Sequence, residues 1–304
     1  MALPADIVEK LEARLGDAEG EARRLDGGIT NHIFRARFGG REVVVRLPGN
    51  ETALLGADRV AEREANERAA SAGVAAALVF ASAEPEMLVT EYVDGETMSE
   101  EAGQLREPGA LAEVAAMLRA VHACTPIAAR FDCFRLVERY AATTRERGGT
   151  VPTAYAEAGR AAARIEAVVA DREPPVLCHN DLLAANFLRG EAGLRLIDWE
   201  YAGVGERWFD LANFATNNEL GSDEEAAFLR AYLGAEPGPA ELGTLALMRL
   251  MSDFREAMWA VVQHTVSDLE VDFAAHAEAH FERLLAVARG PSFEHHLEAA
   301  GAPR

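Results

Sequence analysis

Residues 178–200 read CHNDLLAANFLRGEAGLRLIDWE and set several polar side chains between two short apolar runs. The runs VLC and LRLID predict two buried strands on either side of this segment. Asp181 then lies in the loop after the first strand, Asp198 at the end of the second strand, and Asn186 between them. We therefore expect the oxygen atoms of these three side chains to converge on one site.

Phosphoryl transfer is the chemistry that best explains this set of side chains. The reaction needs an acceptor for the proton of the attacking hydroxyl, and oxygen ligands for Mg²⁺, which prefers a few carboxylate and amide oxygens. The spacing D-x-x-x-x-N followed by a strand-end aspartate is typical of the catalytic and metal-binding loops of protein kinases. Here the two loops read H-N-D and D-W-E. An ordinary turn also favours Asn and Asp, but it does not need this particular set.

The composition indicates a globular protein that folds without disulfides or structural zinc. The chain has 304 residues, of which 49% are hydrophobic, enough for a full core in about two domains. Its three cysteines have no paired spacing, so we expect a reducing, cytoplasmic environment. The net charge of −20 disfavours nucleic acid and acidic membranes as partners. The first twenty residues lack the features of a signal peptide, and no pattern indicates a particular oligomeric state.

The first part of the chain, residues 1–94, predicts a small β-rich lobe that contains one helix. We expect an opening helix near residues 4–18 and an antiparallel meander over residues 24–49 with a tight Gly-Gly hairpin. A run of helix formers then ends at Gly73. Two more strands follow, before the turn at 94–95.

The second part of the chain, residues 95–304, predicts a mainly helical lobe. Apart from the two strands around the opening segment, nearly all of it is rich in helix-forming residues. The helices are expected near residues 110–123, 131–147 and 154–172, with a long helical stretch over residues 239–288. Together the two parts predict an α+β fold with two lobes.

Six motifs occur in the order expected of the choline/ethanolamine kinase family, whose members are relatives of the aminoglycoside phosphotransferases. They are GGITNHIF, VVVRLPGN, LVTEYVDG, CHNDLLAANFL, LIDWEYAGVGERWFDLANF and MWAVVQ. The chain resembles this family from about residue 25 to residue 285. The resemblance implies a protein-kinase-like fold, with a nucleotide-binding lobe over residues 1–94 and the metal and acceptor sites in residues 95–304. It also implies transfer of the γ-phosphate of ATP to the hydroxyl of a small amino alcohol.

The resemblance assigns roles to residues of the opening segment. Asp181 resembles the catalytic base, which accepts or orients the proton of the attacking hydroxyl. Asn186 and Asp198 resemble the ligands of Mg²⁺ and complete the catalytic set. His179 resembles a loop histidine that supports the segment by packing, and Asp210 resembles the buried acid that braces the catalytic loop.

Arg46 stands where a kinase lysine would contact the α and β phosphates of ATP. A planar guanidinium can grip phosphate oxygens, although a surface arginine at a strand edge is the alternative. Its partner should be a glutamate on the following helix. The family pattern R-x-x-E selects Glu62, and Glu64, two positions further on, is the competing choice.

Two further segments resemble nucleotide-binding elements. The loop DGGITNHIF would cover the phosphates, because glycines allow close backbone approach and the polar residues after them offer donors. The segment TEYVDG would be the hinge, whose main-chain groups hydrogen-bond adenine. The nucleotide-binding residues expected in these two segments are Gly28, Thr30, Asn31, Glu91 and Val93.

The acceptor pocket is expected around an aromatic side chain, because aromatic faces and carboxylates hold ammonium groups. Trp259 resembles a tryptophan of the family's amine pocket, with an ordinary core aromatic as the alternative, and Glu200 and Tyr201 follow the metal-binding aspartate as in choline kinases. Where eukaryotic choline kinases generally have a second tryptophan, this chain has Glu256, whose carboxylate could pair with a primary ammonium. The acceptor therefore stays open between ethanolamine, choline, thiamine and an aminoglycoside.

One alternative class of protein and two local features complete the sequence-based interpretation. A pseudokinase that binds nucleotide without turnover is the alternative from a different class, but such a protein would not need all three side chains of the opening segment. His276 and His280 have a spacing that can hold zinc, yet no third ligand is evident and a solvated helix face is expected. Cys178 is expected to be a small residue ending a buried strand rather than a nucleophile.

Overall fold

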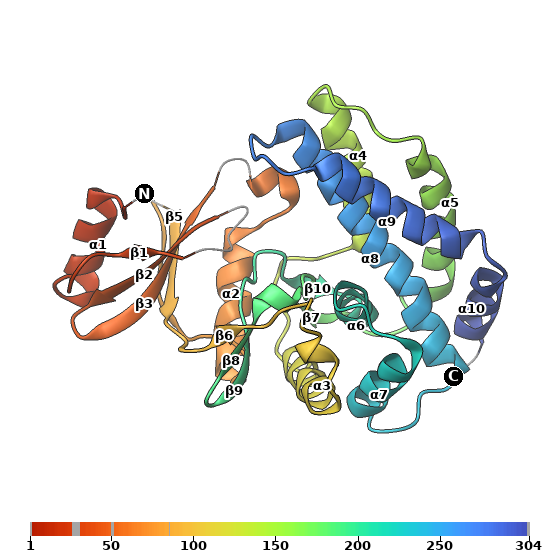
Figure 1. Ribbon diagram of the computed structural model, residues 1–304, viewed down its shortest axis with the longest axis horizontal. Helices are drawn as coiled ribbons and strands as arrows, with labels where there is room; N and C mark the ends of the chain where they lie inside the picture. Colours follow the sequence, from red (N-terminus) through yellow and green to blue (C-terminus); the bar gives the residue numbers. More distant parts are fainter. Residues whose placement is uncertain (1, 26–30, 50–51, 85, 303–304) are drawn as a thin grey trace.

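The computed structural model describes residues 2–25, 31–49, 52–84 and 86–302. They form a smaller lobe built on an antiparallel sheet and a larger, mainly helical lobe (Figure 1). The predicted α+β class and the two-lobed arrangement are therefore confirmed. No helix in the described part of the chain is long and apolar enough to span a membrane.

The sheet of the smaller lobe has the strand order β1-β2-β3-β5-β4. Its strands are β1 Arg23–Arg24, β2 Asn31–Phe38, β3 Arg41–Pro48, β4 Leu78–Ala83 and β5 Glu86–Glu91. The predicted Gly-Gly hairpin joins β2 to β3, and Gly39 and Gly40 have the positive φ angles (52° and 78°) that such a tight turn requires. Helix α1 (Ala5–Leu15) buries Ile7 and Leu11 in a core shared with the sheet.

Helix α2 (Arg59–Ser71) lies between the two lobes (Figure 1). Asp58 caps its start by accepting hydrogen bonds from the N–H groups of Val60 and Ala61 at 2.9 and 3.1 Å. Gly73, with a φ of 76°, follows its end as predicted. Alanines on its buried face belong to the core of the larger lobe. The helix predicted for the smaller lobe therefore also couples the two lobes.

The larger lobe is built around α8 (Pro239–Val266), which contacts α4, α6, α9 and α10. The bounds of the other helices are α3 Pro108–His122, α4 Cys133–Glu146, α5 Ala154–Val169, α6 Arg207–Asn217, α7 Ser222–Leu233, α9 Phe273–Ala288 and α10 Pro291–Gly301. The long helical stretch predicted over residues 239–288 is two helices. The chain turns after Val266, and Asp272 caps α9 by accepting a hydrogen bond from the N–H of Ala275 at 3.0 Å. This break lets α9 lie along α8 (Figure 1).

Two small sheets hold the segment 178–200 within the larger lobe. In the first, β7 (Val176–Cys178) pairs with β10 (Gly203–Gly205), and in the second β8 pairs with β6 and β9. The strands of the second sheet are β6 Glu96–Thr97, β8 Phe187–Gly190 and β9 Gly193–Leu196. Short 3₁₀ turns complete the description at η1 Thr52–Leu55, η2 Gln104–Arg106 and η3 Ala184–Asn186. These pairings fix the strands from which the loops after β7 and β9 start.

Candidate functional site

The loop after β7 is held in place by Asp210 of α6. The two carboxylate oxygens of Asp210 accept hydrogen bonds from the backbone N–H groups of His179 (2.9 Å) and Asn180 (2.7 Å). His122 of α3 contacts the same carboxylate through Nε2 at 3.0 Å. Asn180 has a φ of 67°, a conformation that asparagine tolerates better than most residues and that clusters at functional sites. Asp210 thus fixes the backbone of the loop, in agreement with a bracing role.

His179 joins this loop to the one after β9. Its Nδ1 accepts a hydrogen bond from the N–H of Asp181 at 3.2 Å, so Nε2 carries the proton and donates it to the carbonyl of Ile197 at 3.0 Å. The imidazole also packs edge-on against Trp199, with 4.6 Å between the ring centroids. Burial lowers the pKa of His179 to about 4, which keeps the ring neutral. These contacts are structural, as expected for this residue.

Asp181 is buried at the junction of three elements. Asn186 donates through Nδ2 to the backbone carbonyl of Asp181 at 2.8 Å and to its Oδ2 at 3.2 Å, and Arg255 of α8 donates to Oδ1 at 3.1 Å. Burial raises the pKa of Asp181 to about 7; Arg255 opposes this rise and the surrounding acids add to it. A carboxyl group that titrates near neutral pH is suited to accepting a proton.

Asp198 follows β9 and lies beside Asn186. The N–H of Ile197 donates to the carbonyl of Asn186 at 2.9 Å, which brings the two loops into register. Asp198 has a φ of 63°, a second left-handed residue at this site. Its carboxylate accepts a hydrogen bond from Arg46 of the smaller lobe. Burial raises the pKa of Asp198 and the Arg46 guanidinium opposes the rise.

The donor set of Asn186 and Asp198 fits a magnesium ion. Nδ2 of Asn186 is committed to Asp181, so its amide oxygen is the atom left for a cation. Asp198 supplies carboxylate oxygens on the neighbouring loop. An amide oxygen and a carboxylate, with phosphate and water completing the shell, are what Mg²⁺ prefers. The sequence predicted these two residues as ligands, and the structure brings them together.

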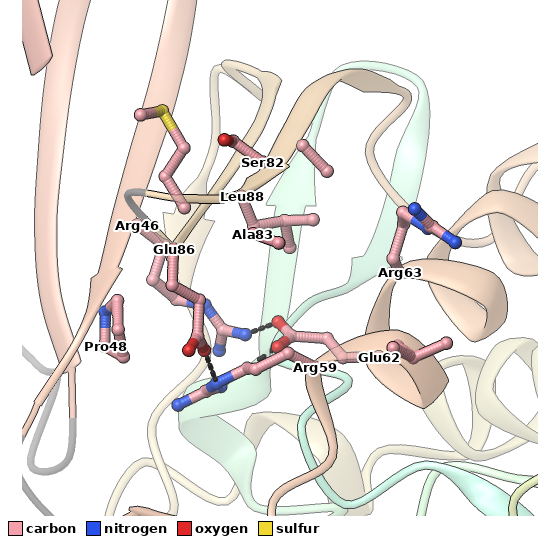
Figure 2. Close-up of a pocket in the computed structure, with 12 residues that line it drawn as sticks. Arg46, Pro48, Arg59, Glu62, Arg63, Ser82, Ala83, Glu86 and Leu88 are labelled. Carbon is pink, nitrogen blue, oxygen red and sulfur yellow. Dashed lines mark hydrogen bonds and ion pairs between the residues drawn. The ribbon is translucent and has the colours of Figure 1, made fainter.

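Arg46 of β3 is paired with Glu62 of α2, as Figure 2 shows. Glu62 is fully enclosed, with 2% of its side chain exposed. Of the two glutamates considered from the sequence, Glu62 therefore faces Arg46, whereas the backbone carbonyl of Glu64 accepts a hydrogen bond from Arg68 at 3.0 Å. Arg46 also reaches the larger lobe through Asp198, so it spans the gap between the lobes.

Arg59, at the start of α2, is a charged residue of the site that the sequence analysis did not single out. Its Nη1 lies 2.9 Å from Glu62 and its Nε lies 2.9 Å from Glu86 (Figure 2). The same Nη1 lies 3.1 Å from Glu200. Its Nη2 donates to Asn31 at 3.0 Å, and Asn31 donates to Glu200 at 3.0 Å. Glu200, expected in the acceptor pocket, is thus held on the nucleotide side. The first position of the R-x-x-E pattern was the sequence signal for Arg59.

A cavity of about 320 Å³ lies between the lobes and collects most of the residues predicted to bind nucleotide. Its lining includes Arg46, Glu62, Asn186 and Asp198 at one end and the segment Glu91–Val93 at the other. Asn31 lies nearby, in the ion-pair network of Arg59. Gly28 and Thr30, also predicted to contact the phosphates, lie outside the described residues.

Of the residues predicted for the acceptor pocket, Tyr201 and Glu256 are linked to Asp181 through Arg255, and Trp259 contacts Tyr201. Trp259 donates through Nε1 to the hydroxyl of Tyr201 at 3.1 Å. Arg255, the residue before Glu256, donates to its carboxylate. The Arg255 guanidinium also stacks on the Tyr201 ring, 4.7 Å from its centroid. Arg255 could not be identified from the sequence, because nothing in the α8 pattern shows which residue meets the catalytic loop.

A second cavity, of about 540 Å³, borders Tyr201 on the side of α4. Three arginines line it, Arg130, Arg135 and Arg139, together with the helix-capping residues Asp58 and Asp132.

The histidines at helical spacing on α9 do not form a metal site. His280 contacts Asp253 of α8 through Nδ1 at 2.9 Å, and the same carboxylate accepts a hydrogen bond from Arg283 at 2.9 Å. His276 packs against Trp259, with 6.3 Å between the ring centroids. The expectation of a solvated helix face is therefore wrong for His280, which joins α9 to α8 through Asp253, whereas His276 is exposed.

Cys178 ends β7 in the core, as expected. Ligating atoms of Cys178, His122 and Asp210 lie within 4.8 Å of one another. Burial raises the pKa of the thiol well above its ordinary value, and Asp210 is occupied by the backbone of the catalytic loop. The thiol therefore stays protonated and unsuited to binding a metal or attacking a substrate.

The sequence matches the "Phosphotransferase enzyme family" over residues 21–245. Ethanolamine kinase 2 of Rattus norvegicus is 34% identical over 134 residues, which are 38% of this chain and 35% of that protein, so the aligned part spans about a third of the relative. A choline/ethanolamine kinase family protein from Mesorhizobium loti superimposes with a TM-score of 0.81 and 29% identity, covering 96% of this chain and 98% of the other. The choline kinase LicA from Streptococcus pneumoniae shares the fold, with a TM-score of 0.78, 22% identity and coverage of 94% and 98%.

Proposed function

We propose, from the premise that the chain belongs to the phosphotransferase enzyme family, that it transfers the γ-phosphate of ATP to the hydroxyl of a small amino alcohol. The observation that carries this proposal is the meeting of Asp181, Asn186 and Asp198 on two loops beside a cavity between the lobes. The likeness to ethanolamine and choline kinases supports the choice of acceptor.

The nucleotide would lie in the cavity between the lobes. The N–H of Glu91 is committed to the carbonyl of Ala77 at 2.9 Å, so the main chain of Val93 is the better candidate to hydrogen-bond adenine. At the other end, Arg46 would grip the phosphates while Glu62 holds its guanidinium in place. Arg46 contacts Asp198 in the structure, and phosphate oxygens would take over part of that contact.

Asn186 and Asp198 would hold Mg²⁺ through their side-chain oxygens. Bound there, the ion would neutralise charge on the phosphate oxygens during transfer. Asp181 would orient the acceptor hydroxyl and take its proton, and its pKa of about 7 makes it a competent base at neutral pH. Arg255 keeps the Asp181 carboxylate in position by a hydrogen bond of 3.1 Å.

The acceptor would lie between Asp181 and the group formed by Tyr201, Glu256 and Trp259. Of Glu200 and Glu256, Glu256 is the better candidate to bind the ammonium group, because it contacts Arg255 beside Asp181. Glu200 is held by Arg59 and Asn31 on the nucleotide side. A primary ammonium can donate hydrogen bonds to Glu256, whereas a quaternary ammonium cannot.

The proposal is tested by incubating the purified protein with Mg²⁺, ATP and single alcohols, and detecting a phosphomonoester by ³¹P NMR together with ADP release. A phosphorylated amino alcohol is the expected product. ADP release independent of any alcohol, or nucleotide binding without product from a broad panel that includes thiamine and aminoglycosides, would contradict the proposal and favour a pseudokinase.

A further inference from the structure

We propose that the acceptor alcohol is a zwitterion, with a carboxylate recognised by Arg255 and an ammonium group recognised by Glu256. This inference rests on the proposed function, because it concerns the acceptor side of the same site. It narrows the substrate class from amino alcohols in general to amino alcohols that also carry an acidic group.

Only one of the three guanidinium nitrogens of Arg255 forms hydrogen bonds to the described residues. Its Nη1 alone contacts both acids, Asp181 at 3.1 Å and Glu256, although 2% of the side chain is exposed. Its Nε and Nη2 are buried and have no hydrogen-bond partner among the described residues. These two nitrogens form the edge of a guanidinium that matches a carboxylate with two parallel hydrogen bonds.

An unpaired buried edge of this kind is unfavourable in a folded protein. Most buried polar groups have a partner, and a charged donor without one loses its hydration without replacement. An arginine that served only to neutralise Asp181 and Glu256 could spread its donors over both acids. The unused edge of Arg255 therefore points to a missing anionic partner. Because the edge is covered, a carboxylate would reach it after a side-chain rearrangement of the kind common on binding.

The contacts of Tyr201 and Trp259 also favour a zwitterionic acceptor over choline. Arg255 lies 4.7 Å over the centroid of the Tyr201 ring, the position that a substrate cation would take in an aromatic cage. A quaternary ammonium placed on this ring would face the guanidinium at close range and be repelled. Trp259 is turned to the Tyr201 hydroxyl and the rings of α9. The pocket thus carries its own cation where choline would need an open aromatic face.

Glu256 supplies the complementary charge. It follows Arg255 on α8, and 9% of its side chain is exposed. In the structure the two side chains neutralise each other. A zwitterion would add two intermolecular pairs, carboxylate to the Nε and Nη2 edge of Arg255 and ammonium to Glu256, without leaving a buried charge alone. Neither ethanolamine nor choline can do this, since each brings a cation only.

The cavity beyond Tyr201 also favours an acidic group on the acceptor. Within the described residues, Arg130 and Arg139 of its lining form no ion pair, while Asp58 and Asp132 are engaged as helix caps. These two arginines therefore bring positive charge to a cavity that borders Tyr201, although the protein as a whole has a net charge of −20. An acceptor with an anionic end is matched to it by charge.

The test uses alcohols that differ by one charged group. L-Serine is ethanolamine with an added carboxylate, L-homoserine bears the same relation to 3-amino-1-propanol, and 3-hydroxypropanoate is serine without its amine. We expect kcat/KM, measured by ADP release with product identified by ³¹P NMR, to be at least about tenfold higher for an amino acid than for its matched amine, because a site built for a charged group rejects the analogue that lacks it.

Substitution of Arg255 separates recognition from support of Asp181. Arg255→Gln should bring the amino acid/amine ratio of kcat/KM to about one, and Arg255→Lys should keep part of the preference because it keeps the charge. A merely structural role would lower both rates together and leave the ratio unchanged. Arg249→Gln is the matched control, since Arg249 lies on the same helix and pairs with Glu225 away from the site.

The outcomes are distinct. The inference is wrong if ethanolamine or choline is phosphorylated with a kcat/KM equal to that of the zwitterions, or if Arg255→Gln keeps the parental amino acid/amine ratio of kcat/KM. The unused edge of Arg255 would then hold only water, and the proposed function would stand. If the parent protein phosphorylates none of these alcohols and no other amine, the proposed function falls and this inference falls with it.

Discussion

Replacing Asp181 by asparagine tests whether the site contains a carboxylate that the fold itself disfavours. Burial raises the pKa of Asp181 from an ordinary value of 3.8 to about 7, against the opposing effect of Arg255. A pKa difference of this size corresponds to roughly 4 kcal/mol in the free energy of unfolding. The folded state holds the proton more tightly than the unfolded state. The contribution of this group to the free energy of unfolding is therefore fully present below about pH 4 and is lost as the pH rises to about 7.

Asp181→Asn should consequently give an inactive protein that is more stable than the parent. At pH 8 the free energy of unfolding should increase by up to about 4 kcal/mol, and at pH 5 the gain should shrink to less than about 2 kcal/mol. The measurement is urea and thermal unfolding of both proteins at the two pH values, with EDTA and without nucleotide. Asp268→Asn, at an exposed position between α8 and α9, is the control and should change little.

An Asp181→Asn protein that is no more stable than the parent at pH 8, or whose advantage is the same at both pH values, would contradict this prediction. Either result would mean that burial does not destabilise the ionised form of the Asp181 carboxyl group. A base poised near neutral pH would then have no support from the structure.

Three further predictions concern turnover. Below pH 7, kcat/KM should fall about tenfold for each pH unit as Asp181 takes up its proton, and a profile flat down to pH 5 would exclude it as the base. Arg46→Ala should lower kcat/KM for ATP by about 30-fold or more, the effect of losing a charge contact worth about 2 kcal/mol. Glu62→Ala should give a similar loss and Glu64→Ala should not. A loss in Glu64→Ala but not in Glu62→Ala would contradict the observed ion pair. Trp259→Ala should lower kcat/KM for the acceptor by roughly 2- to 10-fold, with the KM for ATP unchanged, because it removes the hydrogen bond of about 0.5 to 1.5 kcal/mol that holds the Tyr201 ring against Arg255; equal use of the best acceptor by this variant would place the pocket elsewhere.

Turns and helix ends could be predicted from the sequence, because they depend on the residues at those positions. The Gly39-Gly40 hairpin and the helix stop at Gly73 each follow from residues that reach positive φ without strain. The meeting of Asp181, Asn186 and Asp198 could also be predicted, because strand pairing fixes where the two loops end.

Charge partners across the lobes could not be predicted in the same way. Glu200 and Tyr201 are adjacent in the sequence, but Glu200 turns to Arg59 of the smaller lobe and Tyr201 turns to Arg255 of α8. The sequence motif therefore grouped two residues that serve different sides of the site. Arg255 lies in a helix that is buried all round from Leu250 to Met258, so its sequence pattern does not show which residue meets the catalytic loop. Only the packing of α8 against the catalytic loop identifies it as a residue of the site.

The most direct test of a metal-dependent phosphotransferase is product formation by the parent protein and by Asp198→Asn under identical conditions. The substitution removes one charge at nearly constant volume, so the fold should be retained and thermal unfolding should verify this. With saturating Mg²⁺, ATP and the best alcohol, ³¹P NMR should show a phosphomonoester from the parent and a rate lower by about 100-fold or more from Asp198→Asn. A folded Asp198→Asn protein that forms the product at the parental rate would contradict the account.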